Sequence, residues 1–105
     1  GSVLALESGN LSTNIIIDNS FTLYPNYPNP FNPSTTISYE LNELSDISIN
    51  IYDLNGKIVE SLFNGYKNEG THSIVWEANN LSSGTYLLVI NSNNIFSTQK
   101  LMLIK

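Results

Sequence analysis

The residues in this chain that could perform catalysis are few and poorly grouped. His72 is the only histidine, and its neighbours Thr71 and Ser73 point to the opposite face of a predicted strand. A catalytic triad needs a base that a third group orients, and the sequence brings no aspartate to His72. Glu40 and Glu43 flank a predicted turn, where both carboxylates are expected to stay solvated. We therefore expect no catalytic residues and a function other than that of an enzyme.

Metal-binding chemistry is equally sparse. Asp53-Leu54-Asn55-Gly56 contains a fragment of a calcium loop but lacks the spaced acidic ligands and the closing glutamate. The same residues predict a hairpin turn in which Asp53 bonds local backbone, and Asn55-Gly56 favours the type I′ form. The chain has no cysteine, which excludes disulfides and thiolate metal sites. We expect no metal, no cofactor and no small-molecule substrate.

The charge balance limits the possible partners. The chain has four lysines, no arginine and nine acidic residues, for a formal net charge of −5. A basic face for nucleic acid or for an anionic membrane cannot be assembled from these residues. No apolar run is long enough to span a bilayer. The composition therefore predicts neither a nucleic-acid partner nor a membrane span.

The elements that would position these residues are strands. One-sided alternation of apolar residues occurs over 37–41, 47–51 and 72–76, with turn residues between the runs. Residues 85–90 and 95–104 are apolar on both faces, which is typical of strands in the middle of a packed sandwich. From Phe21 onward we count about seven short strands at the spacing of an immunoglobulin-like antiparallel sandwich, an all-β fold. Its expected core contains Ile37, Tyr39, Ile49, Ile51, Ile74, Trp76, Leu88 and Leu101.

Residues 1–20 differ in character from the rest. Gly1-Ser2 is typical of a tag remnant, and the following residues are mostly polar, as in a linker. No signal peptide is visible, so we expect a fragment whose original N-terminus was removed. Ile15-Ile16-Ile17 could instead add a short edge strand. The predicted organisation is a linker over 1–20 and one domain over 21–105.

The segment from Tyr24 to Pro33 holds all four prolines of the chain. Each proline restricts the residue before it to extended conformations, so the segment cannot be a central strand. We predict a stiff lead-in to the first long strand, with the rings of Tyr24, Tyr27 and Phe31 closing one end of the sandwich. The alternative is a polyproline ligand for another domain.

Five motifs follow one another in the second part of the chain: Pro28–Ile37, Ile51–Val59, Gly70–Trp76, Leu81–Tyr86 and Lys100–Lys105. With these motifs in this order, the chain resembles the type A C-terminal sorting domains of the type IX (Por) secretion system over residues 24–105. It also resembles, less specifically, the immunoglobulin-like domain of flagellar hook-capping proteins. The short terminal strand between two lysines favours the sorting domain.

The resemblance implies a function. Such a domain directs its cargo protein across the outer membrane, so we expect transit through the periplasm and then the cell surface or the medium as the destination. The implied partners are an outer-membrane secretion translocon and a sortase-like peptidase. By the same resemblance, the residues that the machinery recognises are Gly84, Tyr86, Lys100, Leu101, Leu103 and Lys105.

Two other functions remain open at this point. The first is a structural immunoglobulin-like spacer. The second is a carbohydrate-binding accessory module of a secreted enzyme, which would need a row of exposed aromatic side chains. The candidates for that row are Tyr24, Tyr27, Tyr52, Tyr66 and Trp76, although Trp76 shares a face with Ile74 and is expected to fill the core.

Overall fold

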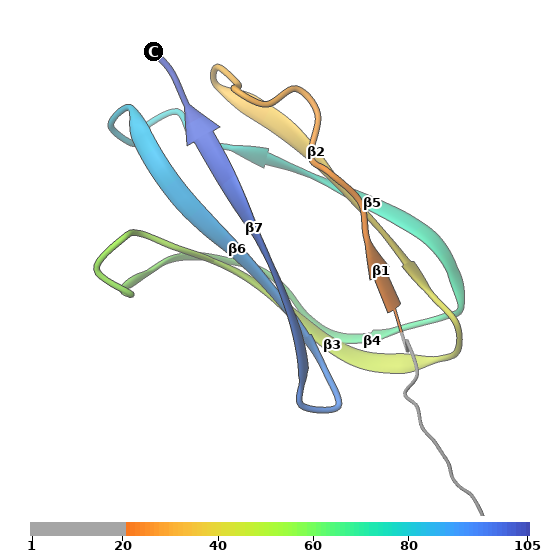
Figure 1. The fold of residues 1–105 in the computed structure, drawn as a ribbon. Helices are drawn as coiled ribbons and strands as arrows, with labels where there is room; N and C mark the ends of the chain where they lie inside the picture. The colour runs from red at the N-terminus through yellow and green to blue at the C-terminus, as the bar shows by residue number, and fades with distance from the viewer. Residues whose placement is uncertain (1–20) are drawn as a thin grey trace, which may run out of the picture.

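The computed structural model describes residues 21–105, which form seven antiparallel strands and no helix (Figure 1). The expectations for residues 1–20, including the possible strand at Ile15–Ile17, lie outside the described residues. The strands are β1 Phe21–Leu23, β2 Ser34–Leu41, β3 Ser45–Tyr52, β4 Ile58–Lys67, β5 Gly70–Glu77, β6 Gly84–Ser92 and β7 Ile95–Leu103.

The strands build two sheets that face each other. The smaller sheet has the order β1-β2-β5, and the larger has the order β4-β3-β6-β7. Burial alternates strictly along β2 and β3, because successive side chains of a strand point to opposite faces. The predicted all-β, immunoglobulin-like sandwich of seven strands is confirmed.

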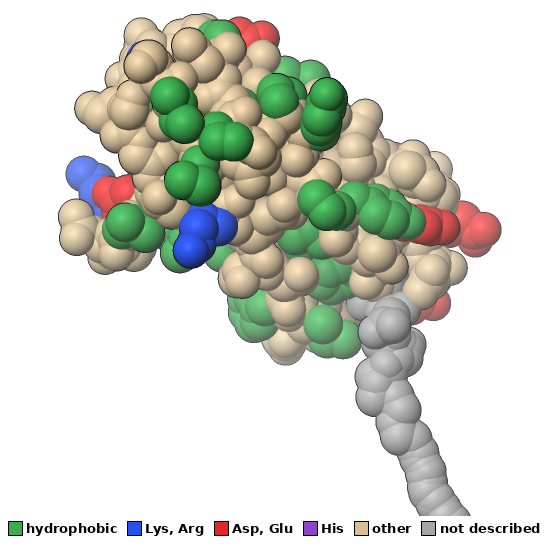
Figure 2. Space-filling model, turned by 45° about the horizontal axis from the view of Figure 1, so that its top comes forward, with side chains coloured by type: hydrophobic (Ala, Val, Ile, Leu, Met, Phe, Trp, Pro, Cys, Tyr) green, Lys and Arg blue, Asp and Glu red, His purple; other side chains and the backbone are tan. Residues whose placement is uncertain are grey.

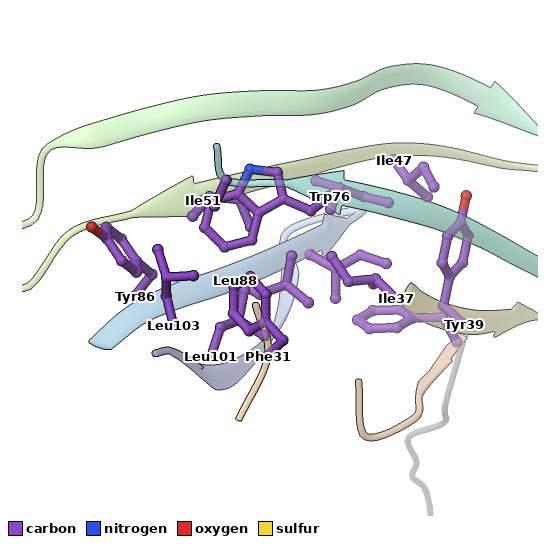
Figure 3. Packing of buried hydrophobic residues seen from close by; sticks show 14 of the residues in the cluster. Phe31, Ile37, Tyr39, Ile47, Ile51, Trp76, Tyr86, Leu88, Leu101 and Leu103 are labelled. Atoms are coloured by element: carbon purple, nitrogen blue, oxygen red, sulfur yellow. The ribbon is translucent and has the colours of Figure 1, made fainter. Parts of the chain in front are cut away.

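One apolar core fills the space between the sheets (Figure 3). Seven of the eight predicted core residues are buried, and six of these have no exposed surface. Ile74 is the exception, since it is only partly buried and packs against the margin of the cluster. Its strand β5 is the edge strand of the smaller sheet, where the opposite sheet gives less cover. Each fully buried side chain of this size stabilises the fold by about 1.5–3 kcal/mol relative to leaving it exposed.

The predicted position of the last strand is wrong. Residues 95–104 are apolar on both faces, but β7 is the edge strand of the larger sheet. Leu101 and Leu103 point into the core, whereas Phe96 and Met102 are exposed on the outer face. Apolar residues on both faces of a strand do not reveal whether a second layer covers the outer one, and here none of the described residues forms such a layer.

The turn types also differ from the prediction. At Asp53–Gly56 only Gly56 has a positive φ, 82°, and its N–H donates to the Asp53 carbonyl at 3.1 Å. This is a type I turn followed by a left-handed glycine, and Asp53 accepts local backbone N–H groups as expected. The two-residue turn with both central residues at positive φ is Asn93-Asn94, between the paired residues Ser92 and Ile95.

Candidate functional site

The six predicted recognition residues gather at one end of the β6–β7 pair. The register sets Gly84 opposite Leu103 and Tyr86 opposite Leu101, while Lys100 lies opposite Leu87. Residues far apart in the sequence thus become direct neighbours, because antiparallel pairing places partners about 4.5–5.5 Å apart. Lys105 follows two residues after the end of β7. The cluster lies where the chain ends (Figure 1).

Three of the six residues belong to the core. Leu101 and Leu103 are 0% and 1% exposed, and Tyr86 is 8% exposed. The Tyr86 ring meets Trp76 edge-on at 5.7 Å between centroids. Its hydroxyl donates to the Ser82 carbonyl at 2.7 Å, a bond to backbone four residues upstream like that of a tyrosine corner. The side chains of these three residues are therefore part of the folded core and do not form a surface that a partner could contact.

The other three residues are exposed. The Lys105 ammonium donates to the Asn79 carbonyl at 2.6 Å, and the backbone N–H of Lys105 donates to Ser83 Oγ at 2.9 Å. The Lys100 ammonium has no polar partner among residues 21–105. A Cβ at Gly84 would meet no atom within 4 Å, so packing does not explain a glycine there. Lys100 is thus the charged side chain of this end that is most available to a partner.

The proline-rich segment holds the C-terminal strand in place, which sequence reasoning missed. The Asn29 side chain acts like a short piece of strand, because its amide donates to the Lys100 carbonyl at 3.3 Å and accepts the Met102 N–H at 3.1 Å. Phe31 continues this pairing in parallel: its N–H donates to the Met102 carbonyl at 2.9 Å, and its carbonyl accepts the Ile104 N–H at 3.0 Å. We call Asn29 and Phe31 the clamp. The signal in the sequence was an asparagine within a run of prolines, a side chain that can replace backbone pairing.

The same segment also pairs with the smaller sheet. Tyr24 N–H donates to the Ser38 carbonyl at 3.0 Å, and Tyr27 pairs with Thr36 of β2. The segment therefore crosses from the edge of β2 to the edge of β7 and closes that side of the sandwich. Phe31 is buried against Trp76, as predicted, but Tyr27 is 80% exposed and Tyr24 is 37% exposed. Only one of the three expected rings closes the end of the sandwich.

The clamp decides which part of the β7 edge stays open. In this register the odd-numbered residues of β7 bond to β6, and the even-numbered residues turn their backbone groups to the free edge. The clamp occupies these groups from the Lys100 carbonyl to the Met102 carbonyl. In the described part of the chain no strand covers the edge at Phe96 and Thr98.

The side chains around this end are mainly apolar. Met102 and Ile104, whose backbone groups the clamp binds, have side chains that are 42% and 54% exposed. Figure 2 shows hydrophobic side chains on the surface with few charged ones among them. Together with Lys100 and Lys105 they form what we call the terminal surface: Lys100, Met102, Ile104 and Lys105. Exposed apolar side chains gathered in one place mark surfaces that bind other proteins.

The side chains considered for chemistry lie apart from this end. His72 Nε2 lies 2.8 Å from the Asn68 carbonyl, a contact that fixes the ring on backbone. No group of three histidine, cysteine or acidic side chains able to hold a metal occurs among residues 21–105. Of the candidates for an aromatic row, Trp76 is excluded, because it is buried in the core and donates its indole N–H to Glu60 at 2.9 Å.

Two tyrosines titrate at higher pH than usual. The hydrogen bond from the Tyr24 hydroxyl to Glu40, at 2.6 Å, raises the pKa of Tyr24, and desolvation and the nearby carboxylate charge add to it. Burial raises the pKa of Tyr39. Both are structural groups at a distance from the terminal surface, so neither shift indicates catalysis.

Comparison with known proteins identifies the family. Residues 23–105 match the model of the secretion system C-terminal sorting domain. Dimeric latent PorU from Porphyromonas gingivalis is a similar solved structure, with a TM-score of 0.63, 21% identity, and coverage of 91% of this chain but 10% of PorU. No curated protein sequence matched. No helix within residues 21–105 could cross a membrane. Since the family model covers nearly all of the described residues, this chain belongs to the family of secretion system C-terminal sorting domains.

Proposed function

We propose that this sorting domain is recognised by an outer-membrane translocon through its terminal surface. Membership of the family gives the general function, which is to direct a cargo protein through the type IX secretion system. The finer proposal concerns the surface that the machinery contacts and the way in which it does so. The domain acts by binding and not by catalysis.

The observation that carries the proposal is the clamp. The outer edge of β7 has no neighbouring strand among the described residues, but the hydrogen bonds from Asn29 and Phe31 fix its backbone as far as Ile104. The outward side chains Lys100 and Met102 are therefore presented in a constant geometry. A preorganised surface of this kind loses little conformational entropy on binding, which favours recognition by a partner.

Charge supports the choice of Lys100. Residues 21–105 contain four lysines and seven acidic residues, a formal charge of −3, so an ammonium group without a polar partner in the described residues contrasts with its surroundings. Lys105 contributes positive charge as well but is partly engaged by the Asn79 carbonyl. An acidic groove on a translocon component would be complementary to this end of the domain.

The test is export of a fusion protein. We would attach residues 1–105 to the C-terminus of a periplasm-targeted reporter in a bacterium with a type IX system. The intact fusion is expected on the cell surface or in the medium, and Lys100→Ala is expected to retain part of it in the periplasm. Lys57→Ala is the matched control, since Lys57 is also an exposed lysine but lies in the β3–β4 turn.

Stability must be measured beside export. Substitution of either exposed lysine should change the free energy of unfolding by no more than about 0.5 kcal/mol. Normal export of a normally folded Lys100→Ala protein would exclude Lys100 from recognition. Failure of the intact fusion to leave the periplasm would instead favour the structural spacer.

The family also supports two finer steps. We propose that the cargo passes through the periplasm before reaching the surface or the medium, and that a sortase-like peptidase cuts on the N-terminal side of Phe21. Cleavage there would separate the cargo from the folded domain without breaking a strand, since β1 begins at Phe21. Mass spectrometry of the exported reporter should find its last residue before Phe21. A cargo that keeps β1 would contradict this site.

A further inference from the structure

A polar hollow lies on the outer face of the larger sheet, at the end of β7 opposite the terminal surface. It has a volume of about 250 Å³. The side chains around it come from three neighbouring strands and from the β6–β7 turn, which lies away from the C-terminus (Figure 1). They are Asp46 and Ser48 of β3, Asn64 of β4, Asn91 of β6, and the turn residues Asn93 and Asn94.

The sheet register explains why these side chains meet. Ser48 lies between Asn64 on one neighbouring strand and Asn91 on the other, so the three form a row across the sheet. All three sit on the face opposite to the buried Ile47 and Ile49. The β6–β7 turn adds its two residues, Asn93 and Asn94, at the end of the same row. These positions lie up to 48 residues apart in the sequence, so only the folded sheet brings them together.

The side chains that line the hollow can form more hydrogen bonds than they make within the domain. Four amides, one hydroxyl and one carboxylate surround it, and each amide can both donate and accept. Asn91 Oδ1 is buried and has no hydrogen-bond partner in the described residues. Buried polar groups are usually paired, so an amide that turned toward a bound donor would gain a bond that it lacks.

The charge of the hollow selects among ligands. Asp46 is its only ionised side chain and no lysine lines it, which disfavours phosphate and other anions. A single carboxylate also disfavours calcium, because calcium sites in proteins usually combine several acidic ligands. Neutral hydroxyl groups suit a site of amides and one carboxylate, because each hydroxyl both donates and accepts.

Two exposed aromatic rings flank the polar residues. Tyr66 is paired with Asp46 on the β4 side and is 69% exposed, and Phe96 is paired with Asn91 on the β7 side and is 62% exposed. These two exposed aromatic rings provide an apolar surface at each edge of the polar site. The hydroxyls of a sugar ring bind polar groups, and its C–H face packs on such rings.

We propose that this hollow binds one neutral sugar unit of a glycan. The volume corresponds to about eight water molecules at roughly 30 Å³ each, which is enough for one ring but not for a chain. The site would be a second binding surface of the domain, separate from the terminal surface. Lys100 and Met102 lie four and six residues along β7 from Phe96, so at about 3.3 Å per residue they are roughly 13 and 20 Å from this edge of the hollow.

The probes are methyl glycosides of glucose, galactose, mannose and N-acetylglucosamine. Calcium chloride and inorganic phosphate are tested as alternative ligands, a cation and an anion. Each is titrated into the ¹⁵N-labelled chain while amide resonances are followed by NMR. At least one glycoside is expected to shift the amides of Ser48, Asn64 and Asn91 with a dissociation constant of a few millimolar, as for small sites with few contacts.

Variants make the assignment specific. Tyr66→Ala and Asn64→Ala are each expected to weaken glycoside binding about fivefold or more. Tyr27→Ala is the control for Tyr66, since Tyr27 is an exposed ring on the other side of the domain. Asn68→Ala is the control for Asn64, because Asn68 is exposed and does not line the hollow. Unchanged amide spectra away from each substitution show that the variants fold.

Several results would overturn the proposal. They are the absence of any shift up to about 50 mM glycoside, shifts centred elsewhere, equal binding by the Tyr66 and Tyr27 variants, or a response to calcium or phosphate alone. The export assay is independent of these results, since it depends on Lys100, which does not line the hollow. A failure of either proposal therefore leaves the other intact.

Discussion

The clamp gives the sharpest test of how this domain presents its C-terminal strand. Asn29→Ala removes two hydrogen bonds to β7, one to the Lys100 carbonyl and one from the Met102 N–H. A typical intramolecular hydrogen bond contributes about 0.5–1.5 kcal/mol net. Both bonds are solvent-exposed, so the backbone groups left behind can bond to water, and the lower half of that range applies. The expected loss is about 1–2 kcal/mol.

Thermal and urea denaturation would measure this loss. For a domain of this size, about 1 kcal/mol lowers the Tm by roughly 4–8 °C, so Asn29→Ala should lower it by about 5–15 °C. Asn32→Ala is the matched control: Asn32 also precedes a proline and is exposed, but its side chain makes no hydrogen bond among residues 21–105. Hydrogen exchange should also show faster exchange of the Met102 amide in the Asn29 variant alone.

The reasoning would be refuted by equal stability of the two variants within about 0.5 kcal/mol, the usual range of neutral surface substitutions. Equal exchange rates of the Met102 amide would refute it independently of stability. If the clamp works as proposed, Asn29→Ala should also reduce export of the fusion while Asn32→Ala does not.

Three further substitutions test other parts of the fold. Tyr86→Phe should lose about 1 kcal/mol in urea denaturation, because it removes the bond to the Ser82 carbonyl and keeps the packed ring; no loss would contradict the role of that bond. Gly56→Ala should lower the free energy of unfolding by about 1–2 kcal/mol, because Gly56 has a φ of 82°, which alanine adopts only with strain, although no atom would clash with the added Cβ. A neutral result would mean that the turn can rearrange. Burial raises the pKa of Tyr39 above its ordinary value of 10.0, so its contribution to stability is complete below pH 10 and is lost as pH rises through the folded pKa. Tyr39→Phe should therefore flatten the alkaline fall in stability, and an unchanged slope would assign that fall to another group.

Much of the fold can be predicted from the local periodicity of apolar residues. Alternation over residues 37–41 and 47–51 identified two strands and their buried faces, because a strand with one face on the core must alternate. Proline placement likewise excluded a central strand over 24–33. Trp76 was expected in the core from the face that it shares with Ile74, and it has no exposed surface.

The recognition residues show where the motifs stop being informative. The sequence motifs marked Tyr86, Leu101 and Leu103 as well as Lys100, but they do not separate side chains that hold the fold from side chains that a partner can reach. That separation depends on which face of β6 and β7 meets the other sheet. The register settles it, since Tyr86 pairs with Leu101 on the inner face while Lys100 faces out.

The sequence alone determined the strands, the all-β class and the resemblance to sorting domains, because each depends on residue order within short segments. Tertiary structure alone decided the edge position of β7, the clamp from Asn29 to β7 and the polar hollow on the outer face. These features join residues from distant parts of the chain: 73 positions separate Asn29 from Met102. Pairing over such separations depends on sheet order and register, which no local pattern encodes, because a side chain is oriented by its own strand but finds its neighbours only when the sheets assemble.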